Sequence, residues 1–75
     1  MKQRDTLYLL NHFTIDEKPM LTTNDIMKIM EVSRPAALHF ADDLIKEGVM
    51  TKKFAGGHFI FFITKAGCDL IGRVR

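Results

Sequence analysis

The sequence predicts one small α+β domain in which three helices precede a β-hairpin and a short C-terminal helix. Three hydroxyl residues that favour helix starts, Thr22, Ser33 and Thr64, each precede a segment with helical character. A Gly-Gly pair, which adopts positive φ angles without steric cost, marks the tip of the hairpin. The 75 residues have room for one core, so residues 1–75 are expected to form a single domain.

Composition and charge indicate an ordinary globular protein with a basic C-terminal third. The chain is 47% hydrophobic and 27% charged, which argues against disorder. Residues 1–50 contain six Lys and Arg against eight Asp and Glu, whereas residues 51–75 contain five against one. This basic third is either a solvated surface or a patch that faces a polyanion.

The sequence carries no membrane or secretion signal. Its longest apolar run, residues 59–63, is far shorter than the roughly 20 residues that cross a bilayer, and the N-terminus lacks a signal-peptide pattern. The single Cys68 cannot form an internal disulfide. We therefore expect a cytoplasmic protein held together by packing, without membrane contact.

The first helix is expected at about residues 3–13, where Leu7, Leu10 and Phe13 recur at helical spacing. It ends before a polar loop, in which Pro19 disfavours a helical conformation of the residue before it. Two extended residues, 20–21, follow.

A capping signal begins the second helix. Thr22 lies three positions before Asp25, as in a capping box, and the Asp25 carboxylate suits the positive end of the helix dipole. The apolar residues of this short helix that are expected to pack inward are Ile26, Ile29 and Met30.

The third helix is expected at residues 33–47. Ser33 is a suitable N-cap, and Pro35 lies in the first turn, where no amide hydrogen is required. Helical projection places Ala37, Ala41, Leu44 and Ile45 inward, with Phe40 at the edge. The opposite face carries Pro35, His39, Asp42, Asp43 and Lys46. Gly48 can adopt the left-handed conformation that ends the helix.

The hairpin is expected to have strands at residues 49–54 and 58–63 and a turn at residues 55–57. Alternation along the second strand leaves both of its sides apolar. The side with Ile60 and Phe62 is therefore expected to be covered by the N-terminal helix, by a second subunit or by a partner.

The last helix is short and begins after Thr64. Leu70 and Ile71 are expected to point into the core. The predicted order is thus α-α-α-β-β-α, with at most a stub of strand before the second helix.

Residues 21–50, LTTNDIMKIMEVSRPAALHFADDLIKEGVM, resemble the helix-turn-helix of winged-helix transcription regulators. FFITKAGCDLI resembles the return strand of the wing in that family, which ends in an apolar residue, Thr, two variable residues and Gly. The resemblance covers residues 21–71. Among small members, the chain is similar to the PapI and FaeA-like fimbrial regulators in length, in Phe40 and in its short wing; regulators of the MarR type are larger. The family often has Gly where Glu31 stands; either Glu31 is left-handed here, at a cost of about 1 kcal/mol, or the turn differs slightly.

The resemblance implies a sequence-specific regulator that reads the major groove of double-stranded DNA with helix 33–47 and contacts the backbone with the wing, residues 51–63. Arg34 can pair with guanine or a phosphate, and His39 can donate a hydrogen bond. Ala36, or an exposed Leu38, can contact a thymine methyl. The candidate DNA-binding residues are Thr23, Ser33, Arg34, Pro35, Ala36, Leu38, His39, Lys52, Lys53 and His58.

Other interpretations of these surfaces remain open. Asp42 and Asp43, one turn beyond the reading end, weaken attraction to DNA or merely solvate a surface. Lys52 and Lys53 either contact phosphates or protect a strand edge from aggregation. The alternative function is a winged-helix module that binds another protein, through its third helix or its apolar strand, and does not bind DNA.

Catalysis has little support in the sequence. The residues that could bind a metal or act as nucleophiles are scattered without ligand spacing: His12, His39, His58 and Cys68. We expect neither enzyme activity nor a cofactor. In free solution we expect a monomer or a weak dimer, which on DNA cooperates with a second copy or with another regulator, as the family resemblance implies.

Overall fold

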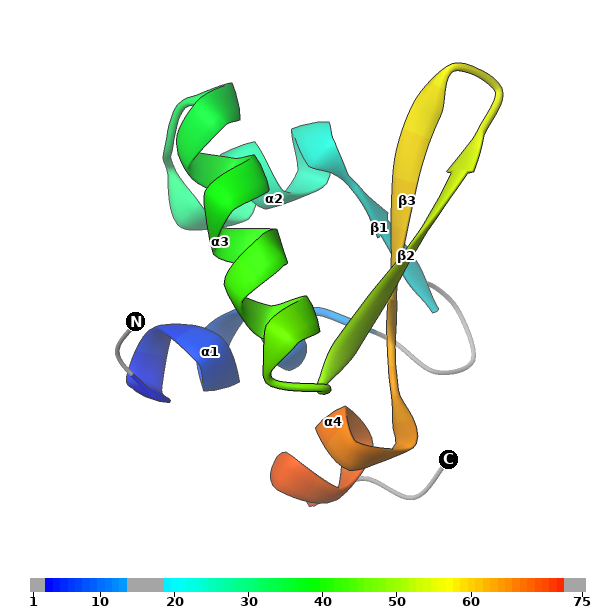
Figure 1. Ribbon diagram of the computed structural model, residues 1–75. Helices are drawn as coiled ribbons and strands as arrows, with labels where there is room; N and C mark the ends of the chain where they lie inside the picture. The colour runs from blue at the N-terminus through cyan, green and yellow to red at the C-terminus, as the bar shows by residue number, and fades with distance from the viewer. Residues whose placement is uncertain (1–2, 14–18, 73–75) are drawn as a thin grey trace.

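The computed structural model describes residues 3–13 and 19–72. In chain order they form α1 (Gln3–Leu10), β1 (Met20–Thr22), α2 (Thr23–Met30), α3 (Arg34–Lys46), β2 (Met50–Ala55), β3 (His58–Ile63) and α4 (Lys65–Leu70). Helices α1, α2 and α3 lie on one side of the hairpin formed by β2 and β3, and α4 lies at the end away from its tip (Figure 1). The predicted α+β order is confirmed. No helix of these two ranges has the length and apolar character that a bilayer crossing requires.

The three strands form an antiparallel sheet in the order β1-β3-β2. The predicted stub of strand is β1, whose Leu21 pairs with Phe61. Strand β2 starts and ends one residue later than predicted because Ala55 still pairs with His58, which leaves a two-residue turn. The glycines of that turn have φ angles of 59° and 80°, as the sequence predicted for the tip.

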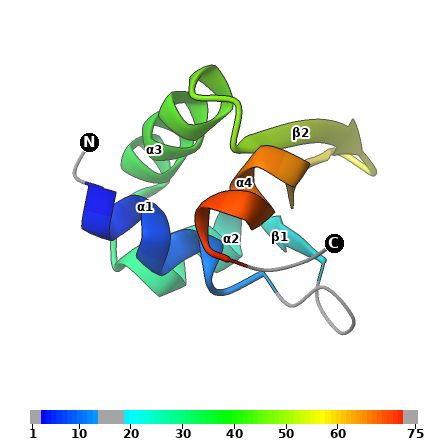
Figure 2. The same cartoon turned by 90° about the horizontal axis from the view of Figure 1, so that it is seen from below.

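Among the described residues, one hydrophobic core lies between the helices and the sheet. Its buried side chains come from each helix and each strand: Leu9, Leu10, Phe13, Leu21, Ile26, Ala37, Ala41, Leu44, Val49, Met50, Phe61, Ile63 and Cys68. Viewed from below, α1 and α4 lie next to each other beneath this core (Figure 2). The core therefore ties both ends of the described chain to the sheet.

Helix α1 ends at Leu10, three residues earlier than predicted. The His12 and Phe13 amides donate to carbonyls three residues back, at 3.0 and 3.2 Å, so the α-helical pattern stops there. Phe13 is buried as expected, but Leu7 is only half-buried, whereas Leu9 is fully buried. The core face of α1 is therefore turned relative to the prediction.

The predicted caps at the starts of α2 and α3 are confirmed. The Asp25 amide donates to Thr22 Oγ1 at 3.2 Å, and the Thr22 amide donates to Asp25 Oδ2 at 2.9 Å, which completes the capping box. Ser33 Oγ accepts the Ala36 amide at 3.4 Å. Between the helices, Glu31 has a left-handed φ of 54°, a conformation that costs a non-glycine residue about 1 kcal/mol.

Helix α3 packs as its spacing predicts, and α4 does so only in part. The inward face of α3 has Ala37, Ala41 and Leu44 buried, with Phe40 and Ile45 half-buried. On α4, the prediction for Leu70 is wrong: this side chain is 43% exposed. The buried Cys68 and the half-buried Ile71 lie one helical turn apart, so Leu70, between them, falls on the other side.

Thr64 connects α4 to the end of α3. Its Oγ1 accepts the Gly67 amide at 3.1 Å, which confirms the predicted cap, and its hydroxyl donates to the Gly48 carbonyl at 2.7 Å. The Thr64 amide also donates to the Val49 carbonyl at 3.1 Å. Gly48 itself has the predicted left-handed φ, 79°. The base of the hairpin is thus closed by hydrogen bonds on both sides.

Candidate functional site

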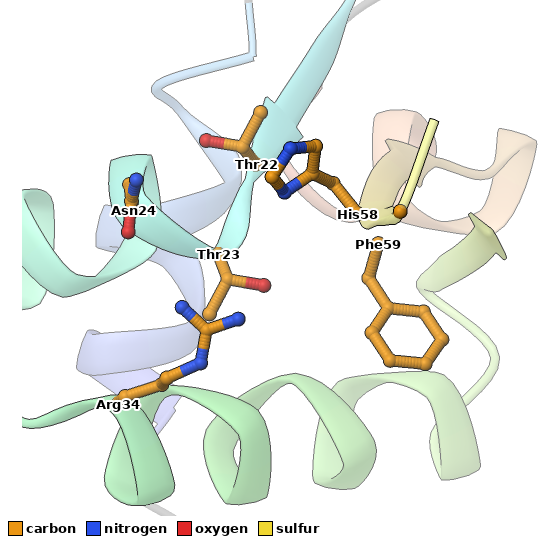
Figure 3. Close-up of a pocket in the computed structure, with 7 residues that line it drawn as sticks. Thr22, Thr23, Asn24, Arg34, His58 and Phe59 are labelled. Atoms are coloured by element: carbon orange, nitrogen blue, oxygen red, sulfur yellow. The ribbon is translucent and has the colours of Figure 1, made fainter. Parts of the chain in front are cut away.

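A cleft of about 330 Å³ lies where α2 begins, α3 begins and the hairpin turns (Figure 3). Its lining residues are Thr22, Thr23, Asn24, Arg34, Gly57, His58 and Phe59. Three of the residues predicted to bind DNA, Thr23, Arg34 and His58, therefore meet at one place although they are far apart in the sequence. The cleft is formed by the ends of elements, where backbone groups and side chains are free to contact a ligand.

The start of α2 faces the cleft with unused hydrogen-bond donors. In the first turn, the amides of Thr23 and Asn24 have no carbonyl earlier in the helix to bind. Thr23 is only 5% exposed, and its hydroxyl points into the cleft (Figure 3). Within the described residues this hydroxyl makes no hydrogen bond, and no buried side-chain oxygen there lacks a partner, so the hydroxyl itself is exposed in the cleft. A ligand group that enters the cleft can therefore contact Thr23, whereas a partner with a flat surface cannot.

The beginning of α3 is exposed, as predicted for a reading end. The exposed candidates there are Ser33, Arg34, Pro35, Ala36 and His39. The Arg34 guanidinium lies beside Thr23 at the mouth of the cleft (Figure 3). Within residues 3–13 and 19–72, Arg34 forms no ion pair, so its charge is available to a ligand.

Leu38 differs from its predicted exposure. It is half-buried and packs against the hydrophobic core. Ala41 and Ile45 lie three and seven residues further along α3, so the three side chains share one helical stripe. Only part of the Leu38 side chain is thus left to contact a partner.

Asp42 and Asp43 both lie beside cationic or titratable groups. Lys52 Nζ, on β2, lies 3.5 Å from Asp42 Oδ1, and His39 Nε2 lies 3.9 Å from Asp43 Oδ2 one turn away on α3. The first pair connects α3 to the hairpin. These carboxylates therefore moderate the positive charge of the candidate surface.

The hairpin presents its two lysines on opposite faces. In the strand register, Lys52 lies opposite Phe61, on the face toward the core. Lys53 lies opposite Ile60, on the other face. Lys52 Nζ also lies 4.8 Å from the centre of the Phe59 ring, within the range of a cation–π contact. Lys53 forms no ion pair within the described residues.

Two aromatic residues of the hairpin were not among the predicted site residues. The Phe54 and Phe59 rings meet edge to face, with centroids 5.1 Å apart, and Phe54 is 62% exposed. Phe59 lines the cleft. Strand alternation places Phe59 on the same side of the second strand as Phe61 and Ile63 and does not mark it as a site residue. A signal was present in the two-residue turn, because Phe54 and Phe59 become cross-strand partners once that turn is assigned.

Within the described parts of the chain, no three His, Cys, Asp or Glu side chains come together in a way that could hold a metal ion. Cys68 is buried in the core. No protein-family model, curated protein or solved structure matches the chain.

Proposed function

We propose that the chain is a winged-helix DNA-binding protein that regulates transcription, reading the major groove with helix 33–47 and contacting the backbone with the hairpin, residues 51–63. The observation that carries this proposal is the meeting of the exposed start of α3 and the hairpin tip at one cleft, with Arg34 and His58 on its two sides. A groove-reading helix contacts base edges with its N-terminal residues. A neighbouring hairpin with cations suits the phosphate backbone.

Individual side chains have different roles in this proposal. Arg34 offers a planar fork of donors that fits guanine or a phosphate. His39, exposed on the next turn, reaches a base edge as donor or acceptor. Ala36 offers a methyl group to thymine, a role in which the half-buried Leu38 takes a smaller part.

The two acidic residues lower the affinity without blocking the surface. The Lys52–Asp42 pair is partly exposed, and exposed pairs contribute about 0–1 kcal/mol, so a DNA phosphate can replace the carboxylate. Lys53 is already available for such a contact. The moderated charge favours sequence reading over strong non-specific binding.

A second candidate function is a winged-helix module that binds a protein and not DNA. It is favoured by the exposure of Phe54 and by the sheet face on which Ile60 and Phe62 are half-buried beside Met20, itself 40% exposed. An apolar face of this kind is typical of protein contacts.

Selection of a duplex from a random pool, followed by anisotropy at two salt concentrations, distinguishes the two functions. A regulator selects a motif and shows steep salt dependence; an interaction module has almost no affinity even at low salt. Arg34→Ala and His39→Ala are each expected to weaken specific binding by about 1–3 kcal/mol. Lys65→Ala, which removes an exposed cation from α4, is the control. If both α3 variants bind like the parent, α3 is not the reader.

The backbone contact has its own test. Changing Lys52 and Lys53 together to Ala is expected to weaken binding to all sequences alike and to reduce the slope of log affinity against log salt by about 2. An unchanged slope would place the hairpin away from the DNA.

A further inference from the structure

We propose that the cleft between α2 and the hairpin is a binding site for the phosphate group of a phosphate ester, with Thr23 and Arg34 as its principal ligands. This site shares Arg34 with base reading by α3, and it differs from that function because its lining also includes the start of α2 and the inner wall of the hairpin. The same chemistry is offered by a small phosphorylated molecule and by a nucleic-acid backbone.

Thr23 is the residue that points most directly to a ligand. Thr23 is only 5% exposed, yet its hydroxyl makes no hydrogen bond within the described residues and faces the cleft (Figure 3). Because no buried side-chain oxygen of those residues lacks a partner, the part of Thr23 that remains exposed includes this hydroxyl. A phosphate oxygen in the cleft would accept this hydroxyl. The neighbouring first-turn amides of α2 and the positive end of its dipole favour the same anion.

The side chains that line the cleft also suit an anion. Arg34 and His58 line it from opposite sides, and no Asp or Glu is among its lining residues. Asp25, the acidic residue in the first turn of α2, is held by the Thr22 amide at 2.9 Å, outside that lining. A guanidinium without a carboxylate partner is the group that most favours a phosphate oxygen.

The size of the cleft and its aromatic wall suit a phosphate ester better than a free phosphate ion. Its volume of about 330 Å³ is roughly ten times the 30 Å³ that one water molecule occupies, so a phosphate group leaves space beside it. Phe59 provides an aromatic wall for that space, and its ring is held by Phe54 and Lys52. A planar or sugar group attached to the phosphate can pack against this wall.

Titrations followed by amide and Arg Nε–H resonances test the site, with inorganic phosphate, phenyl phosphate and a short DNA duplex as separate probes. We expect shifts at Thr23, Asn24 and Arg34, and tighter binding of phenyl phosphate than of inorganic phosphate. If the duplex alone produces these shifts, the ester is that of a nucleic-acid backbone. If phenyl phosphate produces them in a chain that fails to bind any duplex, this site stands while the proposed DNA-binding function fails.

Matched variants make the test specific. Arg34→Gln and Thr23→Val are each expected to weaken phenyl phosphate binding by about tenfold, the scale of one hydrogen bond to a charged group. Thr23→Ser keeps the hydroxyl and is expected to retain binding, which separates loss of the donor from loss of packing. Lys65→Gln removes one positive charge, as Arg34→Gln does, and is expected to leave phenyl phosphate binding unchanged. Absence of shifts with all three probes, or an equal loss in Lys65→Gln, overturns the proposal.

Discussion

Replacing Gly67 by Ala tests how closely α4 packs against the base of the hairpin. A Cβ added to Gly67 would lie 2.7 Å from Ile63 Cγ1 and would collide with the Val49 carbonyl oxygen. That oxygen already accepts the Thr64 amide at 3.1 Å, and the Thr64 hydroxyl donates to the Gly48 carbonyl at 2.7 Å. The backbone therefore cannot move away without lengthening these bonds.

Two opposing effects determine the expected change in stability. Helix propensity alone would make Ala more stable than Gly by about 1 kcal/mol. Overpacking typically costs about 1–3 kcal/mol, and a weakened hydrogen bond costs about 1 kcal/mol more. We expect Gly67→Ala to lower the free energy of unfolding by about 2 kcal/mol. For a domain of this size that corresponds to a fall in Tm of about 8–16 °C.

Urea and thermal unfolding followed by circular dichroism measure this change. Ala66→Gly, at the exposed neighbouring position of α4, reports helix propensity without the collision. It is expected to destabilise by about 1 kcal/mol at most. The sign of the change in free energy of unfolding decides the test for Gly67→Ala. A variant as stable as the parent, or more stable, would show that α4 does not lie against the Val49 carbonyl as described.

Three further predictions concern the turn, the cap and assembly. Glu31→Gly is expected to raise the free energy of unfolding by up to about 1 kcal/mol, because glycine accepts the left-handed φ; an unchanged urea midpoint contradicts this. Thr22→Ala is expected to lower the free energy of unfolding by about 1 kcal/mol through loss of the capping box. Thr22→Ser keeps the hydroxyl and is expected to retain the stability of the parent. By sedimentation at micromolar concentration we expect a monomer or a weak dimer, and a dimer that persists at nanomolar concentration would mean that the face with Ile60 and Phe62 is a stable interface.

Local signals predicted most of the elements, because the interactions that define them are local. Thr22, Ser33 and Thr64 each accept the amide of the residue three positions later, so their caps are visible in the sequence. The place of the hairpin tip follows from its two glycines in the same way, although the expected turn of residues 55–57 was one residue too long. The end of α1 was misjudged because its last turn changes to shorter-range hydrogen bonds, which apolar spacing does not report.

The cleft was not predictable from local signals. Thr23, Arg34 and Phe59 come from three segments, and they meet because β1 pairs with β3 in one register. Leu38 and Leu70 were misjudged for a related reason. Leu38 lies on the inward stripe of α3 with Ala41 and Ile45, and Leu70 lies away from the buried side of α4, so the burial of each depends on how neighbouring elements are placed against its helix.

The pairing of β1 with β3 has a consequence for the synthesis of the chain. Leu21, which is almost fully buried in the folded domain, pairs with Phe61, forty residues further along the chain. Ribosomes add roughly 5–20 residues per second, so Leu21 waits about 2–8 s before its partner has been made. Helices α2 and α3, whose hydrogen bonds are local and whose residues lie between Leu21 and Phe61, can form during this interval. The sheet, and with it the cleft, is completed only after β3 has left the ribosome.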